Sequence, residues 1–208
     1  MKMLKGLDVS HHDGPIDWKK VAKAGAAFAI IKASEGTTFT DPLYHSNVRG
    51  ALAAGLRVSS YHYFKATREA WNQLQHFLHV VGDLKGQLVP ALDVEEHGDL
   101  SPADYSKSVR AWLDGFEQLH GRKAILYTYP DFNAHALQHT FGDHPLWVAS
   151  YPKAGLKGKP AQLAGWTSWT FWQYTDHGTW PGVPGTKSTD LDVFAGEAAE
   201  LDKLLMGQ

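Results

Sequence analysis

Short apolar segments alternate with helical segments over the first 150 residues, and this rhythm constrains the fold more than any other feature of the sequence. Residues 28–33, FAIIKA, are almost all apolar, as in parallel strands that are buried on both faces. Helix signals follow such runs: Asp17 precedes residues 18–23, and Ser101 with Pro102 begins a segment with one apolar face. Parallel strands need helical crossovers of this kind, so we predict five strand–helix units.

The expected elements add up to an α/β protein. We predict strands at residues 4–9, 28–33, 57–64, 88–94, 123–128, 146–150, 169–175 and 191–194. We predict helices that begin at Asp17, Asp41, Thr67, Ser101 and Asp131, with a last helix at 197–205 and loops at 153–168 and 176–189. About eight strands, as five βα units followed by three strands with few helices, favour an irregular (β/α) TIM-like barrel.

One competing architecture is a doubly wound open sheet. Such a sheet normally carries a glycine-rich phosphate loop after its first strand, and residues 8–14, DVSHHDG, do not form one. No linker or low-complexity segment interrupts the chain, so we expect a single catalytic domain over residues 1–208.

Composition excludes several classes of function. A net charge of −2 gives no basic excess for nucleic acid, and the lack of cysteine removes thiolate chemistry and disulfides. Residues 24–31, the longest apolar run, are too short to cross a bilayer, and the N-terminus, MKMLK, lacks the apolar stretch of a secretory signal. We therefore expect a monomer made in the cytoplasm, with no nucleic acid partner and no integral membrane association.

Functional groups of a (β/α) barrel lie at the C-terminal ends of its strands. Acids and aromatic residues gather at these positions. They are Asp8, Lys32, Glu35, Tyr61, Tyr63, Asp93, Glu95, Tyr127, Tyr151, Gln173, Asp190 and Asp192. A barrel end with a purely structural role does not need so many carboxylates.

Asp93 and Glu95 form the most informative pair. Side chains alternate along a strand, so both carboxylates share one face, roughly 5–7 Å apart. Each charge raises the pKa of the other, and the less solvated group keeps its proton, which provides the acid and the anion that glycosidic cleavage requires. A solvated loop start and a magnesium or calcium site are the other interpretations. The aromatic residues favour a sugar groove over an ion site, namely Tyr61, Tyr63, Tyr127, Trp147 and Tyr151.

Nine segments carry a family resemblance, in one order along essentially the whole chain. They are GLDVS (6–10), IDW (16–18), IKASEG (31–36), SYHYF (60–64), ALDVE (91–95), ILYT (125–128), LWVASY (146–151), WQYT (172–175) and TDLDVF (189–194). In these segments the sequence is similar to the glycoside hydrolase family 25 lysozymes, the N-acetylmuramidases of bacteria, fungi and bacteriophages. The resemblance implies a barrel of five βα units completed by three further strands.

The resemblance also implies roles for individual residues. Glu95 would be the general acid, and Asp93 its partner, either attacking directly or positioning the 2-acetamido group of the substrate. Asp8 and Asp190 would complete the catalytic set, with Asp190 favoured over Asp192. The implied substrate contacts are Tyr61, Tyr63, Tyr127, Trp147, Tyr151, Gln173 and Asp192.

We expect no cofactor and no metal in this site. The run His11-His12-Asp13 looks like a metal motif, but it has no third ligand at a suitable spacing. We expect His62 to pack away from Tyr61 and Tyr63, because neighbouring side chains of a strand point to opposite faces.

The sequence therefore predicts a lysozyme that hydrolyses the β-1,4 bond between N-acetylmuramic acid and N-acetylglucosamine in peptidoglycan. We expect a bacteriolytic endolysin of a phage or prophage that degrades the cell wall after its release. The alternatives are a catalytically silent peptidoglycan-binding module and a chitinase-like hydrolase. The acid pair argues against the binding module, because binding alone requires no raised carboxyl pKa.

Overall fold

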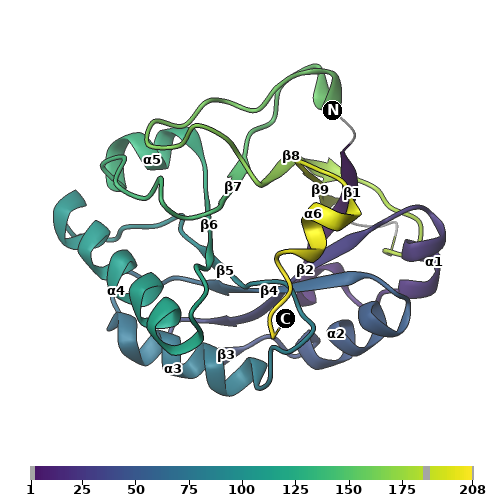
Figure 1. Cartoon of the computed structure of the whole chain (residues 1–208), viewed down its shortest axis with the longest axis horizontal. Coiled ribbons are helices and arrows are strands. Elements are labelled where there is room, and N and C mark those ends of the chain that lie inside the picture. Colours follow the sequence, from purple (N-terminus) through teal and green to yellow (C-terminus); the bar gives the residue numbers. More distant parts are fainter. Residues whose placement is uncertain (1–2, 185–187, 208) are drawn as a thin grey trace.

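The computed structural model describes residues 3–184 and 188–207 (Figure 1). Met1, Lys2 and three residues of the loop expected at 176–189 lie outside the described residues. The strands are β1 (Leu4–Val9), β2 (Phe28–Glu35), β3 (Phe39–Thr40), β4 (Arg57–Tyr63), β5 (Ala91–Asp93), β6 (Ile125–Thr128), β7 (Leu146–Ala149), β8 (Phe171–Gly178) and β9 (Thr189–Phe194). The helices are α1 (Trp18–Lys23), α2 (Tyr44–Ala53), α3 (Ala70–Val81), α4 (Pro102–His120), α5 (Pro130–Ala136) and α6 (Ala198–Asp202).

Eight of the described strands close into a barrel. Their order is β1-β9-β8-β7-β6-β5-β4-β2, and β1 pairs in parallel with β2 to complete the ring. Strand β9 is antiparallel to both of its neighbours, β1 and β8, whereas the other barrel pairs are parallel. The closed ring confirms the expected irregular (β/α) barrel and rules out the open doubly wound sheet.

The direction of β9 decides which of its acids reaches the barrel mouth. The parallel strands end at the mouth, so the antiparallel β9 begins there. Asp190 lies beside Asp8 in the register, whereas Asp192 lies beside Gly6 and Gln173, one step further into the barrel. The structure thus separates two aspartates that the sequence alone left on one strand face.

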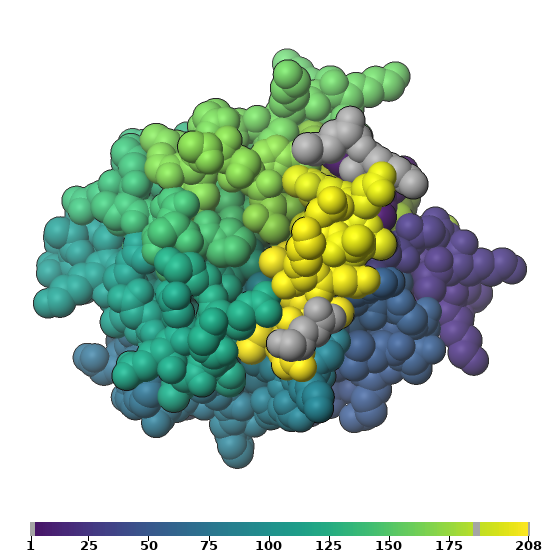
Figure 2. Space-filling view, viewed as in Figure 1, coloured from purple at the N-terminus to yellow at the C-terminus, as the bar shows by residue number. Residues whose placement is uncertain are grey.

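The opposite end of the barrel is closed. Phe28, Phe171 and Phe194 pack together there, with ring centroids 5.1 Å apart for the first two and 5.2 Å apart for the last two. A Cβ atom at Gly6 would lie 2.5 Å from the Phe28 ring, so only glycine leaves room for this ring. The C-terminal segment lies on the face seen in Figure 2, and the Leu204 carbonyl accepts the Val89 N–H just before β5 begins. Described side chains therefore fill this end of the barrel.

Several element boundaries differ from the sequence prediction. The helix expected from Asp41 begins at Tyr44, because the Asp41 carboxylate accepts the backbone N–H groups of His11 and Leu43 and holds a turn there. The strand expected at 88–94 begins at Ala91, since Pro90 has no N–H to donate to a neighbouring strand. Asp131 lies in the first turn of α5 rather than at its cap.

The amphipathic helices cover the outside of the parallel half of the barrel (Figure 1). The expected stripe of α4 is buried at Tyr105, Val109, Trp112 and Phe116, whereas its last member, Leu119, is 52% exposed. His62 is also buried on this outer side, where its ring stacks on Trp112 and Nδ1 bonds to Ser34 Oγ at 2.8 Å. This confirms that His62 packs away from the mouth. No helix in the described parts of the chain is long and apolar enough to cross a membrane.

Candidate active site

A cleft of about 590 Å³ opens at the mouth of the barrel. It is lined by residues at or just beyond the mouth ends of β1, β2, β4, β5 and β9. They are Ser10, His12, Asp13, Lys32, Tyr61, Tyr63, Asp93, Glu95, Ser188 and Asp190. Acids and aromatic residues that are far apart in the sequence thus face one cavity.

Asp93 and Glu95 project from the end of β5 into this cleft. Asp93 lies beside Tyr63 of β4 and Tyr127 of β6 in the register. The backbone is held on both sides, because the Asp93 carbonyl accepts the Phe64 N–H at 2.9 Å and the Val94 N–H donates to the Tyr127 carbonyl at 3.1 Å. The two carboxyl groups are hydrogen bonded to each other. The strand alternation therefore places both acids on one face, as predicted.

The environment of this pair keeps a proton on it. Burial raises the pKa of Asp93 well above its usual value, and the negative charge of Glu95 raises it further. Burial also raises the pKa of Glu95, but the hydrogen bond from Asp93 acts in the opposite direction. Asp93 is 6% exposed and Glu95 is half-buried. In the free cleft the pair therefore holds a proton, and Glu95, the less buried member, faces incoming sugar.

A second group of acids lies where β1 meets β9. Burial raises the pKa of Asp8 well above its usual value, and the charges of Asp190 and Asp192 add to the effect. Burial is also the main reason that the pKa values of Asp190 and Asp192 are raised to about 7. Such acids can hold protons at neutral pH, which limits the charge that gathers in the barrel.

The amide of Gln173 joins this second group to two tyrosines. Gln173 Nε2 donates to Asp8 Oδ2 at 2.7 Å and to Asp190 Oδ2 at 3.3 Å. Gln173 Oε1 accepts the hydroxyl groups of Tyr127, at 3.0 Å, and Tyr151. All of these bonds agree with one orientation of the amide, so Gln173 fixes both acids relative to the aromatic wall.

Tyr61 connects the two acid groups. Burial raises the pKa of its hydroxyl well above the usual value, and the charges of Asp8, Asp93 and Asp190 raise it further. Tyr61 also lines the cleft together with Asp93 and Asp190. The acids of β1, β5 and β9 therefore surround one space.

The structure divides the expected site residues into two layers. Tyr61, Tyr63, Asp93, Glu95 and Asp190 line the cleft, and Tyr151 lies at its rim, 48% exposed. Directly beneath the cleft lie Asp8, Tyr127, Trp147, Gln173 and Asp192.

Trp147 and Asp192 were expected to contact substrate, and the structure corrects this expectation. Trp147 is 2% exposed and Asp192 is fully buried. The Trp147 indole N–H donates to Asp192 Oδ1 at 2.8 Å, and its ring lies 4.4 Å from that of Tyr127. Because β9 runs down into the barrel, Asp192 falls below the cleft, and Trp147 holds it there.

Two lysines brace one wall of the cleft. Lys32 Nζ bonds to Glu35 at 2.8 Å, and Lys65 Nζ lies 3.1 Å from the same carboxylate. Both ammonium groups also lie over the ring of Tyr63, at 4.9 Å and 4.7 Å from its centroid. The ion pair between Lys32 and Glu35 therefore lies against a cleft-lining ring and fixes it.

Sequence reasoning missed Ser10, His12 and Asp13 as cleft residues. They follow β1 in a short turn in which Asp13 accepts the Ser10 N–H at 2.9 Å. Their position just after a barrel strand was the available signal. The neighbouring His11 instead bonds to the Asp41 carboxylate at 2.8 Å.

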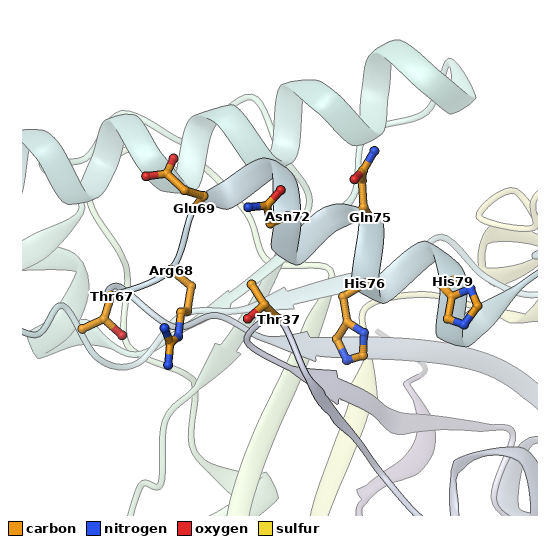
Figure 3. Close-up of a pocket in the computed structure, with 8 residues that line it drawn as sticks. All are labelled: Thr37, Thr67, Arg68, Glu69, Asn72, Gln75, His76 and His79. Atoms are coloured by element: carbon orange, nitrogen blue, oxygen red, sulfur yellow. The ribbon is translucent and has the colours of Figure 1, made fainter.

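A second cavity, of about 630 Å³, lies beside α3 (Figure 3). It is lined by Thr37, Thr67, Arg68, Glu69, Asn72, Gln75, His76 and His79. Glu69 is the one carboxylate among these described lining residues. Hydrolysis of an acetal needs an acid and an anion together, so the mouth cleft is the better candidate despite its smaller volume.

The buried acids predict a pH dependence of stability. Asp190 and Asp192 have pKa values of about 7 in the folded protein and about 3.9 when unfolded. The folded state therefore binds more protons between these values, and stability falls as pH rises through this window. We expect a lower thermal midpoint at pH 8 than at pH 5.5, and a smaller difference for Asp192→Asn. Asp99→Asn, an exposed control, should keep the full difference; an unchanged difference in Asp192→Asn contradicts the assignment.

The comparisons with known proteins agree with this geometry. Residues 7–183 match the model of glycosyl hydrolases family 25. The autolytic lysozyme of Clostridium acetobutylicum is 34% identical over 92% of this chain and 56% of its own length. The uncharacterized YegX protein of Escherichia coli K12 is 35% identical over 98% of this chain and 74% of its own.

Solved structures show the same fold. A bacterial lysozyme from Streptomyces coelicolor superposes with a TM-score of 0.88 at 29% identity, covering 97% of this chain and 96% of that one. A family 25 glycosyl hydrolase from Bacillus anthracis gives a TM-score of 0.87 at 30% identity, over 98% and 94% of the two chains. The family match covers most of the barrel and includes Asp8, Asp93 and Glu95. It ends before β9, so it does not include Asp190 and Asp192. The chain therefore belongs to glycosyl hydrolase family 25, as a glycoside hydrolase of the lysozyme type.

Proposed function

We propose that this enzyme hydrolyses the β-1,4 bond between N-acetylmuramic acid and N-acetylglucosamine in peptidoglycan, with Glu95 as the general acid. The observation that carries the proposal is the hydrogen-bonded Asp93–Glu95 pair, which holds a proton in a cleft walled by Tyr61 and Tyr63. Tyrosine rings suit the apolar faces of sugars. Membership of a lysozyme family supports the same substrate.

The first step moves the shared proton to the leaving group. A bound sugar removes water from Glu95, which raises its pKa further and draws the proton across the hydrogen bond from Asp93. Glu95 then protonates the glycosidic oxygen as the bond from that oxygen to the anomeric carbon breaks. Asp93 is left as an anion beside the positive charge that develops on the sugar.

The short separation of Asp93 and Glu95 favours attack by the 2-acetamido group of the substrate over direct attack by Asp93. A carboxylate that attacks the anomeric carbon lies about 5–5.5 Å from the acid, and an inverting pair is about 6.5–9.5 Å apart. Asp93 is hydrogen bonded to Glu95, which is closer than either arrangement. We propose that the 2-acetamido oxygen attacks while Asp93 holds the amide N–H. This attack closes an oxazoline ring on the sugar. Glu95, now an anion, takes a proton from water as the water attacks the anomeric carbon and breaks its bond to the acetamido oxygen. The configuration at that carbon is therefore retained.

Asp8, Asp190 and Gln173 act next to this centre. Asp190 faces the cleft, and Gln173 holds it beside Asp8. Their partial negative charge stabilises the cationic sugar, and the tyrosine hydroxyls bonded to Gln173 fix its amide. We assign Trp147 and Asp192 as positioning residues that support this group from below.

We further propose that the enzyme works as a monomer and as a phage-type lysin on the bacterial wall. The CTP1L endolysin is among the similar solved structures, with a TM-score of 0.75 at 26% identity over 98% of this chain and 70% of that one. Sedimentation of the active enzyme as a dimer would contradict the monomer.

Release of reducing ends tests the proposed substrate. We expect the purified enzyme to release them from isolated peptidoglycan and to act far more slowly on chitin oligomers. Equal rates on chitin would instead favour the chitinase-like alternative. Binding to peptidoglycan without any release of reducing ends would favour the catalytically silent module.

A further inference from the structure

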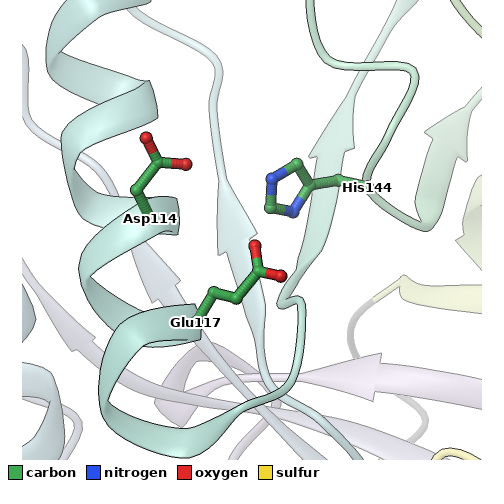
Figure 4. A group of neighbouring side chains, drawn as sticks. All are labelled: Asp114, Glu117 and His144. Carbon is green, nitrogen blue, oxygen red and sulfur yellow. The ribbon is translucent and has the colours of Figure 1, made fainter.

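A second cluster of ligating side chains lies at the end of the barrel opposite the cleft. Asp114 and Glu117 extend from one face of α4 toward the ring of His144 (Figure 4). One ligand atom from each residue lies within 4.8 Å of the other two. His144 lies two residues before Leu146, the first residue of β7, so the cluster lies near the starts of the parallel strands. It is therefore separate from the catalytic mouth.

His144 presents an unused nitrogen to this cluster. Its side chain is fully buried, and Nε2 has no hydrogen-bond partner among the described residues. The nearest acid oxygen outside the cluster, Asp143 Oδ2, lies 3.7 Å from Nε2, beyond hydrogen-bond length. A buried nitrogen without a hydrogen bond is costly, and a ligand would satisfy it.

The position and tautomer of His144 are fixed. Nδ1 lies 3.0 Å from the Ala124 carbonyl, which accepts only if Nδ1 carries the proton. Burial lowers the pKa of His144, so the ring is neutral and Nε2 keeps its lone pair. Its backbone N–H donates to Phe141, and its carbonyl accepts the Trp166 indole N–H at 2.8 Å. Metal-binding histidines are commonly oriented by such a bond from the second nitrogen.

The two carboxylates remain available for a ligand. Their ion pairs are long, 3.9 Å from Asp114 to Arg110 and 3.8 Å from Glu117 to Lys123. Arg110 and Lys123 instead bond closely to Asp143. With His144 neutral, the three acids and two cations leave one net negative charge. The local field therefore favours a cation.

We propose that Asp114, Glu117 and His144 bind a divalent transition metal of the zinc class, with water completing the coordination. An imidazole nitrogen with two carboxylate oxygens suits zinc, whereas calcium and magnesium prefer oxygen ligands alone. Zinc ligands lie about 2.0–2.2 Å from the metal, so the carboxylates must move inward. Asp114 is exposed and Glu117 half-buried, which leaves both free to rotate toward the fixed His144.

The metal would join α4 to the segment that leads into β7. It would act on stability and not on catalysis, because the cluster and the cleft lie at opposite ends of the barrel. At a zinc concentration of roughly 100 times Kd, we expect the thermal midpoint to rise by roughly 5–10 °C.

Calorimetric titration of metal-free protein with zinc chloride tests this proposal. We expect one site in the wild type whose affinity falls at least tenfold in Glu117→Gln and in Asp114→Asn. Both substitutions lie on the helix surface and leave the His144 hydrogen bond to Ala124 intact. The thermal shift with zinc should disappear in the same variants.

Two control variants show whether zinc binds at other exposed carboxylates or imidazoles rather than at the proposed cluster. Glu69→Gln removes an exposed carboxylate of the second cavity, and His45→Gln removes an exposed imidazole of α2. Both should keep the wild-type affinity and thermal shift. The proposal is overturned if Glu117→Gln and Asp114→Asn bind zinc as tightly as the wild type, or if the wild type shows no binding below millimolar zinc.

Discussion

The Glu95→Gln variant is expected to lower kcat on peptidoglycan by about 10²–10⁴-fold, the usual contribution of a general acid. Glutamine preserves the shape of the side chain but has no acidic proton for the leaving oxygen. The side chain of Glu95 is half-buried. Among the described residues, its carboxyl group is hydrogen bonded to Asp93 alone. We therefore expect the thermal midpoint to remain near the wild-type value. Turnover of purified peptidoglycan and thermal unfolding measure the two effects.

Glu96→Gln is the matched control. Glu96 is the next residue, but its carboxylate bonds to Lys65 at 3.1 Å and does not line the cleft. It should therefore retain most of the wild-type turnover. Wild-type turnover in Glu95→Gln would remove Glu95 from the role of general acid.

The Asp93→Asn variant is expected to lower kcat by about 10²–10³-fold, as for the loss of one electrostatic contact to a transition state. Asparagine cannot become the anion that faces the cationic sugar. It also cannot share a proton with Glu95, whereas burial and the charge of Glu95 raise the pKa of Asp93 in the wild type. In the variant Glu95 must hold the proton alone. The alkaline limb of the pH–rate profile should therefore move to lower pH.

The role of the acetamido group gives a separate test of Asp93. If the substrate provides the nucleophile, walls whose muramic acid has lost its N-acetyl group should resist the wild-type enzyme. Cleavage of these walls at the normal rate, or isolation of a glycosyl ester on Asp93, would instead establish direct attack by Asp93.

Local patterns were sufficient to predict much of the fold and the main acid pair. Strand alternation predicted that Asp93 and Glu95 share one face, and both line the cleft although β5 ends at Asp93. Likewise, the apolar spacing of α4 predicted its buried face. These features are encoded within a few residues, and the structure agrees with them.

Features that depend on distant strands could not be predicted in this way. The choice between Asp190 and Asp192 depends on the direction of β9, which is set by its pairing with β1 and β8. The burial of Trp147 depends on the same strand, because its indole bonds to Asp192. The raised pKa values of Asp93 and Glu95 depend on how deeply the whole barrel buries each carboxyl group.

The cluster around His144 shows the same limit. Asp114 and Glu117 are one helical turn apart, but nothing in the local sequence brings them near His144. Only the packing of α4 beside the start of β7 does so. Metal ligands gathered by tertiary structure have no fixed spacing for sequence reasoning to find.

The most direct test of the account is mass spectrometry of the fragments that the enzyme releases from purified peptidoglycan. If the Asp93–Glu95 cleft breaks the bond at the anomeric carbon of muramic acid, every new reducing end will be N-acetylmuramic acid. New reducing ends on N-acetylglucosamine would contradict the proposed cleavage site.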